Sequence, residues 1–161
     1  MQRRQQRDII QLNIRRIDKG DVERLGTLYK QLGFVISIEQ LYGRLDMLLA
    51  AKENALYLAE LPKGELIGWV HASISIALYI DPVVSVRELI IDREMRSVGA
   101  EQALLQVIEQ WARDQFCSAI YLWSEMLQQK DPSFYHNFGY SQQSSQVLRK
   151  LLIAPDSRVL H

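Results

Sequence analysis

The spacing of apolar residues along the chain predicts both strands and helices. Residues 12–17 alternate between apolar and polar, as expected of a strand with one buried face. In residues 22–32 the apolar residues recur every three or four positions, which predicts a helix that ends at Gly33. A second helix is predicted to begin at Ser37, because Ser37 and Gln40 have the spacing of a capping box.

The middle of the chain contains three strand-like stretches separated by turn signals. These stretches are residues 55–61, 66–80 and 83–91. Pro62 and Gly64 mark the first turn and Asp81-Pro82 marks the second, so we expect an antiparallel meander. One face of the middle strand is expected to carry four apolar side chains: Ile74, Ile76, Leu78 and Ile80.

The strongest helical pattern covers residues 99–116, and residues 119–124 follow it as a short strand. Because a strand, a helix and a second strand follow one another, we expect strands 83–91 and 119–124 to be parallel neighbours. The chain is predicted to finish with a short helix over residues 132–139 and a strand or hairpin over residues 140–152.

Composition and charge limit the functions that fit this pattern. The chain has 161 residues, and we expect one domain over residues 12–152, a flexible arm over 1–11 and a tail over 153–161. Lys and Arg together number 19, as do Asp and Glu, so no net charge attracts nucleic acid or a membrane. The single cysteine excludes an intramolecular disulfide, and the three histidines lack metal-ligand spacing. We therefore expect a soluble, cytoplasmic protein without a bound metal.

The segment covering residues 86–101 predicts a binding site for an anion. A strand leads into a short polar turn that contains Arg96, and Gly99 stands at the start of the long helix. The first N–H groups of a helix have no intrahelical acceptor, and the helix dipole adds about half a positive charge there. Strand, turn and helix N-terminus in this order therefore predict a phosphate or pyrophosphate site.

Three motifs, taken with the order of the predicted elements, resemble the GNAT superfamily of N-acetyltransferases. The family's fourth strand and its R/Q-x-x-G-x-G/A cofactor loop look like Leu89-Ile90-Ile91-Asp92 followed by Arg96-Ser97-Val98-Gly99-Ala100-Glu101. The family's A-L-L resembles Ala103-Leu104-Leu105, and its F-Y-x-x-x-G-F/Y segment resembles Phe134-Tyr135-His136-Asn137-Phe138-Gly139-Tyr140. The resemblance implies an α/β (α+β) fold, with a mixed central sheet of about six or seven strands flanked by about four helices.

The resemblance also implies N-acetyl transfer from acetyl-CoA, as co-substrate, to a primary amine of a small molecule or peptide. Backbone groups of Leu89, Ile90 and Ile91 would hold the pantetheine arm like an added strand. The pyrophosphate would bind the loop and the first helical turn, at Arg96, Ser97, Val98, Gly99, Ala100 and Glu101. Tyr135 would protonate the departing thiolate, since a phenol can donate a proton, whereas spacing alone would have it pack in the core.

Two residues depart from the family's cofactor loop. Ser97 stands where a glycine commonly follows the arginine, and Glu101 stands where a small residue closes the loop. A carboxylate at position 101 suits the helix dipole but would repel a pyrophosphate in the same place. An alternative function is therefore a catalytically inactive GNAT-fold protein that binds acyl-CoA or another protein. A homodimer through residues 140–152 or through a free sheet edge also fits the sequence.

Glu88 is the candidate for the base that accepts a proton from the acceptor amine. Strict alternation along the strand places Glu88 with Ile90 and places Arg87 on the other face, so one of the two charges approaches a core or a cleft. The other interpretations are an Arg–Glu pair and a bulge that turns one of them to solvent. The resemblance puts the acceptor near residues 20–50. His71, in the middle of a strand, either lines that pocket or is a hydrogen-bonded sheet histidine.

Overall fold

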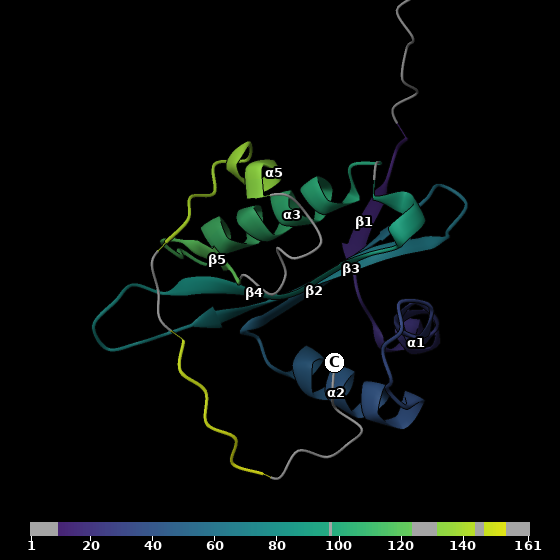
Figure 1. The fold of residues 1–161 in the computed structure, drawn as a ribbon, viewed down its shortest axis with the longest axis horizontal. Coiled ribbons are helices and arrows are strands. Elements are labelled where there is room, and N and C mark those ends of the chain that lie inside the picture. The colour runs from purple at the N-terminus through teal and green to yellow at the C-terminus, as the bar shows by residue number, and fades with distance from the viewer. Residues whose placement is uncertain (1–9, 97, 124–131, 144–146, 154–161) are drawn as a thin grey trace, which may run out of the picture.

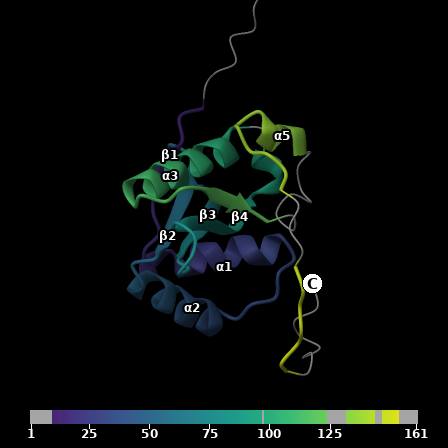
Figure 2. The same ribbon diagram turned by 90° about the vertical axis from the view of Figure 1, so that its left-hand side faces the viewer.

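The computed structural model describes residues 10–96, 98–123, 132–143 and 147–153, which form one sheet between two layers of helices (Figure 1). The strands are β1 (Asn13–Arg16), β2 (Asn54–Glu60), β3 (Leu66–Ser75), β4 (Val83–Ile91) and β5 (Ile120–Leu122). The helices are α1 (Val22–Gln31), α2 (Ile38–Ala50), α3 (Ala100–Asp114) and α5 (Pro132–His136), with short 3-10 helices at Lys19–Asp21 and Arg93–Met95. The perpendicular view shows α1 and α2 on one side of the sheet and α3 and α5 on the other (Figure 2).

The sheet has the strand order β1-β2-β3-β4-β5. The pairs β1–β2, β2–β3 and β3–β4 are antiparallel, whereas β4 and β5 are parallel. The predicted meander and the predicted parallel pair around the long helix are therefore both confirmed. The predicted capping box is confirmed as well: Ser37 Oγ accepts the N–H of Gln40 at 3.1 Å, and Gln40 Oε1 accepts the N–H of Ser37 at 3.2 Å.

The two faces of the sheet carry separate cores, and neighbouring residues of β3 contribute to one or the other. Trp69 packs under α1 and α2 together with Leu25 and Leu45. Val70, the next residue, packs under α3 together with Leu104. We call these two sides the α1 face and the α3 face.

The prediction that residues 66–80 form one strand was wrong over its second part. β3 ends at Ser75, because Ser75 pairs with Val83 and the residues between them form the connection. Ile74 is half-buried against the α3-face core. Beyond β3 there is no sheet face for the other three predicted side chains, and all three are exposed: Ile76, Leu78 and Ile80.

The prediction of a final strand over residues 140–152 was wrong for the parts that the structure describes, 140–143 and 147–152. Ser141-Gln142-Gln143 is continuously polar and Leu151-Leu152-Ile153 continuously apolar, so this segment lacks the alternation of a half-buried strand. Within the described residues β5 has no second neighbour, and the sheet has five strands rather than six or seven. The α/β class is confirmed.

Candidate functional site

A bulge in β4 decides which way its charged residues point. β4 pairs with β3 on both sides of Arg87, but Arg87 itself has no opposite residue. In a regular strand Val86 and Leu89 would face opposite sides of the sheet, because they are three positions apart. With the bulge, both contribute to the α3-face core, and Arg87 is exposed. Of the interpretations that the sequence leaves open, the bulge is correct, and it turns Glu88 to the α1 face.

Beyond the bulge, one edge of β4 is open with respect to the described part of the chain. β5 pairs with residues 84–86 of β4, and no described residue pairs with the rest of the strand on that side. On the other side, Asp92 donates its N–H to the carbonyl of Ile67 at 2.8 Å, just past the end of β4. Because backbone groups alternate in direction along an antiparallel strand, those of Leu89 and Ile91 face the open edge.

The open edge leads into the N-terminus of α3. Gly99, the N-cap residue, has a φ of 85°, a left-handed conformation that glycine adopts without strain. Gly99 has no side chain to cap the helix, and the first intrahelical bond runs from Ala103 N to Gly99 O at 3.1 Å. The N–H groups of Ala100, Glu101 and Gln102 therefore lack an intrahelical acceptor, as a helix N-terminal anion site requires.

The other residues of the predicted cofactor loop lie just before Gly99. Arg96 and Val98 are half-buried, and Val98 packs against the α3-face core. Ser97 lies outside the described residues. The loop begins with the 3-10 helix Arg93–Met95, which Asp92 caps by accepting the N–H of Glu94 at 3.0 Å.

Glu101 is buried in the structure, at 6% exposure, instead of projecting into solvent from the start of the helix. Its charge acts on Tyr135 of α5, which is 4% exposed and packs in the α3-face core with Leu89 and Ala100. Burial first, and the charge of Glu101 second, raise the pKa of Tyr135 to about 12, so the phenol stays protonated at neutral pH. The side chain of Tyr135 thus packs in the core, as the spacing of apolar residues alone predicts. It lies beside the first turn of α3.

On the α1 face, Glu88 is held by two neutral donors. The hydroxyl of Tyr29 on α1 donates a short hydrogen bond to Glu88 Oε2, and Trp69 Nε1 on β3 donates to the same oxygen at 3.3 Å. Burial, followed by the charge of Glu88, raises the pKa of Tyr29, so its hydroxyl remains a donor. Neither Tyr29 nor Trp69 is expected at the site from the sequence, where apolar spacing marks both only as core residues.

His71 lies opposite Glu88 on β3 but has a different partner. Its Nε2 is 2.9 Å from Asn54 Oδ1. Burial lowers the pKa of His71 in spite of the nearby charge of Glu88, so the imidazole is neutral at pH 7. These contacts fit the interpretation as a hydrogen-bonded sheet histidine.

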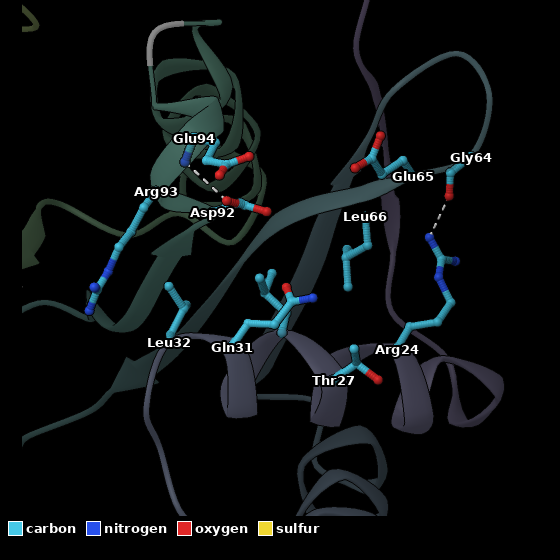
Figure 3. Close-up of a pocket in the computed structure, with 11 residues that line it drawn as sticks. Arg24, Thr27, Gln31, Leu32, Gly64, Glu65, Leu66, Asp92, Arg93 and Glu94 are labelled. Carbon is cyan, nitrogen blue, oxygen red and sulfur yellow. Dashed lines mark hydrogen bonds between the residues drawn. The ribbon is translucent and has the colours of Figure 1, made fainter.

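The two candidate catalytic groups lie on opposite faces of the sheet. Tyr135 belongs to the α3-face core, whereas Glu88 bonds to α1. The open edge of β4 runs between the two faces, so a ligand along it is accessible from both. On the α1 face a cavity of about 630 Å³ lies between α1, the turn after β2 and residues 92–94 (Figure 3). Arg24 lines this cavity and donates to the carbonyl of Gly64 at 2.8 Å.

Within the described residues, no group of three or more His, Cys, Asp and Glu side chains could hold a metal ion. No helix among those residues is both long enough and apolar enough to cross a membrane.

Three solved structures similar to this chain share its fold. The aminoglycoside antibiotic 6'-N-acetyltransferase of Acinetobacter baumannii is 20% identical, with a TM-score of 0.74 over 89% of this chain and 100% of that one. The glucosamine-6-phosphate N-acetyltransferase of Arabidopsis thaliana is 15% identical, with a TM-score of 0.72 over 87% and 98% of the two chains. AAC(6')-Iy, in complex with the bisubstrate analogue CoA-S-monomethyl-acetylneamine, is 19% identical, with a TM-score of 0.72 over 89% and 99%.

A comparison with curated proteins finds no match. The sequence profile of the acetyltransferase (GNAT) family matches residues 24–140, a segment that contains β4, α3 and α5. This match covers well over half of the chain and agrees with the order of its strands and helices. The resemblance predicted from the motifs is confirmed, and the chain belongs to the acetyltransferase (GNAT) family.

Proposed function

We propose that this protein is an N-acetyltransferase that moves an acetyl group from acetyl-CoA to a primary amine of a small molecule or peptide. The observation that carries the proposal is the open edge of β4, whose pairing with β5 stops at Val86, shortly before the N-terminus of α3. Backbone groups on such an edge can pair with an extended ligand that contains amides. A phosphate at the end of that ligand would meet the N–H groups of the helix.

The residues present fit the pantetheine and pyrophosphate of acetyl-CoA. The backbone groups of Leu89 and Ile91 face the open edge, whereas those of Ile90 face β3. We therefore propose that pantetheine forms its backbone hydrogen bonds with Leu89 and Ile91, and that Ile90 lies between them. A Cβ added at Gly99 would meet no atom within 4 Å, so there is open space at the start of the helix. The pyrophosphate is proposed to bind the loop and first turn, at Arg96, Ser97, Val98, Gly99, Ala100 and Glu101.

Acetyl-CoA supplies a thioester, whose carbonyl carbon accepts the amine nitrogen as its carbon–sulfur bond breaks. Glu88 takes the proton of the ammonium and passes it to water, because Tyr29 and Trp69 orient the carboxylate without cancelling its charge. Tyr135, on the opposite face, gives its phenolic proton to the departing sulfur. The proton that the nitrogen loses as the amide forms then restores the phenol through water.

The similar structures support a small-molecule amine as the acceptor. One is an aminoglycoside antibiotic 6'-N-acetyltransferase and another is a glucosamine-6-phosphate N-acetyltransferase. In this chain we propose that the amine enters on the α1 face, where Glu88 is held.

The proposal is tested by titrating the purified protein with acetyl-CoA and CoA in a calorimeter, and by measuring thiol release with a panel of amines. We expect a Kd between about 1 μM and 1 mM and amine-dependent thiol release. Tyr135→Phe should keep the acetyl-CoA affinity while kcat falls by about 100-fold. Equal loss of affinity and kcat would mean that Tyr135 only packs. Absence of binding at millimolar acetyl-CoA would overturn the proposal, and binding without turnover of any amine would indicate an inactive binding protein.

A further inference from the structure

The two hydrogen bonds that hold Glu88 both end on the same carboxylate oxygen. The hydroxyl of Tyr29 donates to Oε2, and the indole N–H of Trp69 donates to Oε2 at 3.3 Å. Among the described residues no donor reaches Oε1, although no buried side-chain oxygen or nitrogen there lacks a partner. Since Glu88 is half-buried and Oε1 has no such partner, Oε1 is open to solvent. The protein thus holds one oxygen and leaves the other accessible.

The fold brings these three side chains together from three elements. After the bulge at Arg87, Glu88 lies opposite His71 on β3, and Trp69 is two residues away on the same face of that strand. Tyr29 reaches Glu88 from α1, which covers this face of the sheet (Figure 2). Tyr29 and Glu88 are 59 residues apart in the chain, so their hydrogen bond ties α1 to β4.

Packing fixes the ring of Tyr29 independently of its hydroxyl. The ring lies 4.6 Å from that of Trp69 and 5.6 Å from that of Phe34, centroid to centroid, and both contacts are edge-to-face. Tyr29 is half-buried and packs against the α1-face core, to which the buried Trp69 belongs. A ring that is already packed loses little further rotamer freedom when its hydroxyl forms a hydrogen bond. The hydroxyl is therefore a preorganised donor for Oε2.

We infer that Tyr29 is a positioning residue for the base, with Trp69 as the second donor: together they hold Oε2 of Glu88, so that Oε1 is presented to the acceptor amine and the carboxylate stays ionised. A hydrogen bond to the charged form of a carboxyl group favours that form. A neutral donor does so without adding a cation that would compete with the ammonium. The inference rests on the proposed function, because it takes Glu88 as the base.

The proton that the ammonium loses goes to Oε1 of Glu88, and Tyr29 neither gains nor loses one. Burial raises the pKa of Tyr29, so its hydroxyl remains a donor while Glu88 is ionised. Tyr29 therefore acts through Glu88 and needs no contact with the acceptor.

Other charged groups lie around this arrangement. On the sheet they are His71, opposite Glu88, and Arg87, which precedes it on β4. On α2, the charge of Arg44 acts on Tyr29. The cavity on the α1 face is lined by charged residues of both signs (Figure 3): Arg24, Glu65, Asp92, Arg93 and Glu94. Removal of the Tyr29 hydroxyl leaves all these groups in place, so a change in the titration of Glu88 would report the hydroxyl itself.

The first test follows the titration of Glu88 by ¹³C NMR, in the full chain labelled at the carboxyl carbons of its glutamates. The signal of Glu88 is the one that Glu88→Gln lacks. In Tyr29→Phe this signal should titrate about one pH unit higher than in the wild type, because the ionised form loses a hydrogen bond. Trp69→Phe should give a smaller shift in the same direction, since its hydrogen bond is the longer one.

Tyr140→Phe is the matched control. The hydroxyl of Tyr140 also donates to a glutamate, Glu109 of α3, at 2.9 Å, and Tyr140 packs against the α3-face core on the other side of the sheet. The substitution removes the same chemical group from the same kind of hydrogen bond. It should leave the titration of Glu88 unchanged.

The second test is thiol release from saturating acetyl-CoA with the amine of the panel that reacts fastest. In Tyr29→Phe the acidic limb of the kcat/KM profile should move to higher pH by the same amount. On the plateau, kcat/KM should fall by about tenfold, because the carboxylate is less well oriented. The calorimetric Kd for acetyl-CoA should stay within about twofold, since the hydroxyl contacts the base alone. Tyr140→Phe should match the wild type in all three measurements.

A folded Tyr29→Phe in which the titration of Glu88 does not move would overturn the inference, while turnover by the wild type would leave the proposed function standing. An NMR shift without a shift of the acidic limb would overturn it too, because Glu88 would then not be the base. If Tyr29→Phe does not fold, Trp69→Phe decides by the direction of the same two shifts. If the wild type binds acetyl-CoA but turns over no amine, the proposed function fails, and this inference fails with it.

Discussion

Two carboxylates, Asp21 at the start of α1 and Glu60 at the end of β2, are held differently from Glu88 in β4. Arg15 Nη2 lies 2.7 Å from Asp21 Oδ1 and 2.9 Å from Glu60 Oε1. Arg24 adds a second ion pair to Glu60 at 2.9 Å. Glu88, by contrast, accepts from a hydroxyl and an indole, and neither donor carries a charge.

Under the proposed function, this difference separates a structural role for Asp21 and Glu60 from a chemical role for Glu88. The hydrogen bond from Arg15, more than any other cause, lowers the pKa of Asp21. Burial raises the pKa of Glu60, but hydrogen bonds from two arginines and Asn13 outweigh it and the net pKa is lowered. These two carboxylates are ionised and fully matched by the protein's own cations. Glu88 is oriented but not neutralised by its hydrogen-bond donors, so a cation from outside the protein can complete its site.

Of the substitutions that test this comparison, Glu88→Gln is expected to have the largest effect, and the effect is on activity. The amide keeps the size of the side chain and can still accept from Tyr29, but it cannot take up a proton. Since a positioned base contributes about 10²–10⁴-fold, kcat/KM for a monoamine should fall by about 100-fold or more. The Kd for acetyl-CoA, measured by calorimetry, should stay within about twofold, because the change removes an interaction with the amine alone.

Glu60→Gln is the matched control, since it makes the same chemical change in the other group of carboxylates. Its kcat/KM should remain close to that of the wild type. If the two variants lost activity equally, loss of negative charge on this side of the molecule would be the cause, and Glu88 would have no special role.

The next largest effect is expected on the stability of the fold, which Glu60→Gln should lower. Two guanidinium groups lose a charged partner that is 8% exposed, so the free energy of unfolding at pH 7 should fall by about 2 kcal/mol in urea denaturation. The folded-state pKa values of Glu60 and Asp21 lie below the unfolded ones. Their stabilisation is therefore present above about pH 4 and lost as the pH falls further. The difference in the free energy of unfolding between Glu60→Gln and the wild type should therefore be smaller at about pH 3 than at pH 7. A difference that does not change with pH would mean that Glu60 acts through packing alone.

The parts of the fold that depend on local pattern are the parts that could be predicted. The capping box at Ser37, the three-strand meander and the long helix all follow from residues close in sequence. Residues 76–80 were predicted to continue the strand because their apolar residues keep the alternation of Ile74, and residues 140–152 were predicted to finish the chain as a strand or hairpin. Whether an apolar segment pairs depends on a distant strand with a free edge, and single-sequence patterns carry no such information.

The candidate site shows the same limit at the level of single residues. The resemblance to the GNAT family implies that Gly99 and Tyr135 belong to one site, and in the fold Tyr135 packs beside the first turn of α3. The direction of Glu88 depends on the bulge at Arg87, which breaks the alternation from which its face is read. Its closest partner, Tyr29, is 59 residues away in the chain, so no local signal could have paired them.

The smallest effect is expected from Glu101→Gln, which tests a buried carboxylate that serves neither of the two roles above. Loss of the charge from the first turn of α3 should lower the free energy of unfolding by about 0.3–1 kcal/mol, because the favourable interaction with the helix dipole is lost. The same change should strengthen CoA binding by about two- to fivefold, because the pyrophosphate no longer meets a negative charge. Urea denaturation and calorimetry thus give effects of opposite sign from one substitution. Unchanged or weaker CoA binding would show that burial against Tyr135 already shields the phosphate from the charge of Glu101. In that case, having Glu101 where the family has a small residue would not weaken CoA binding.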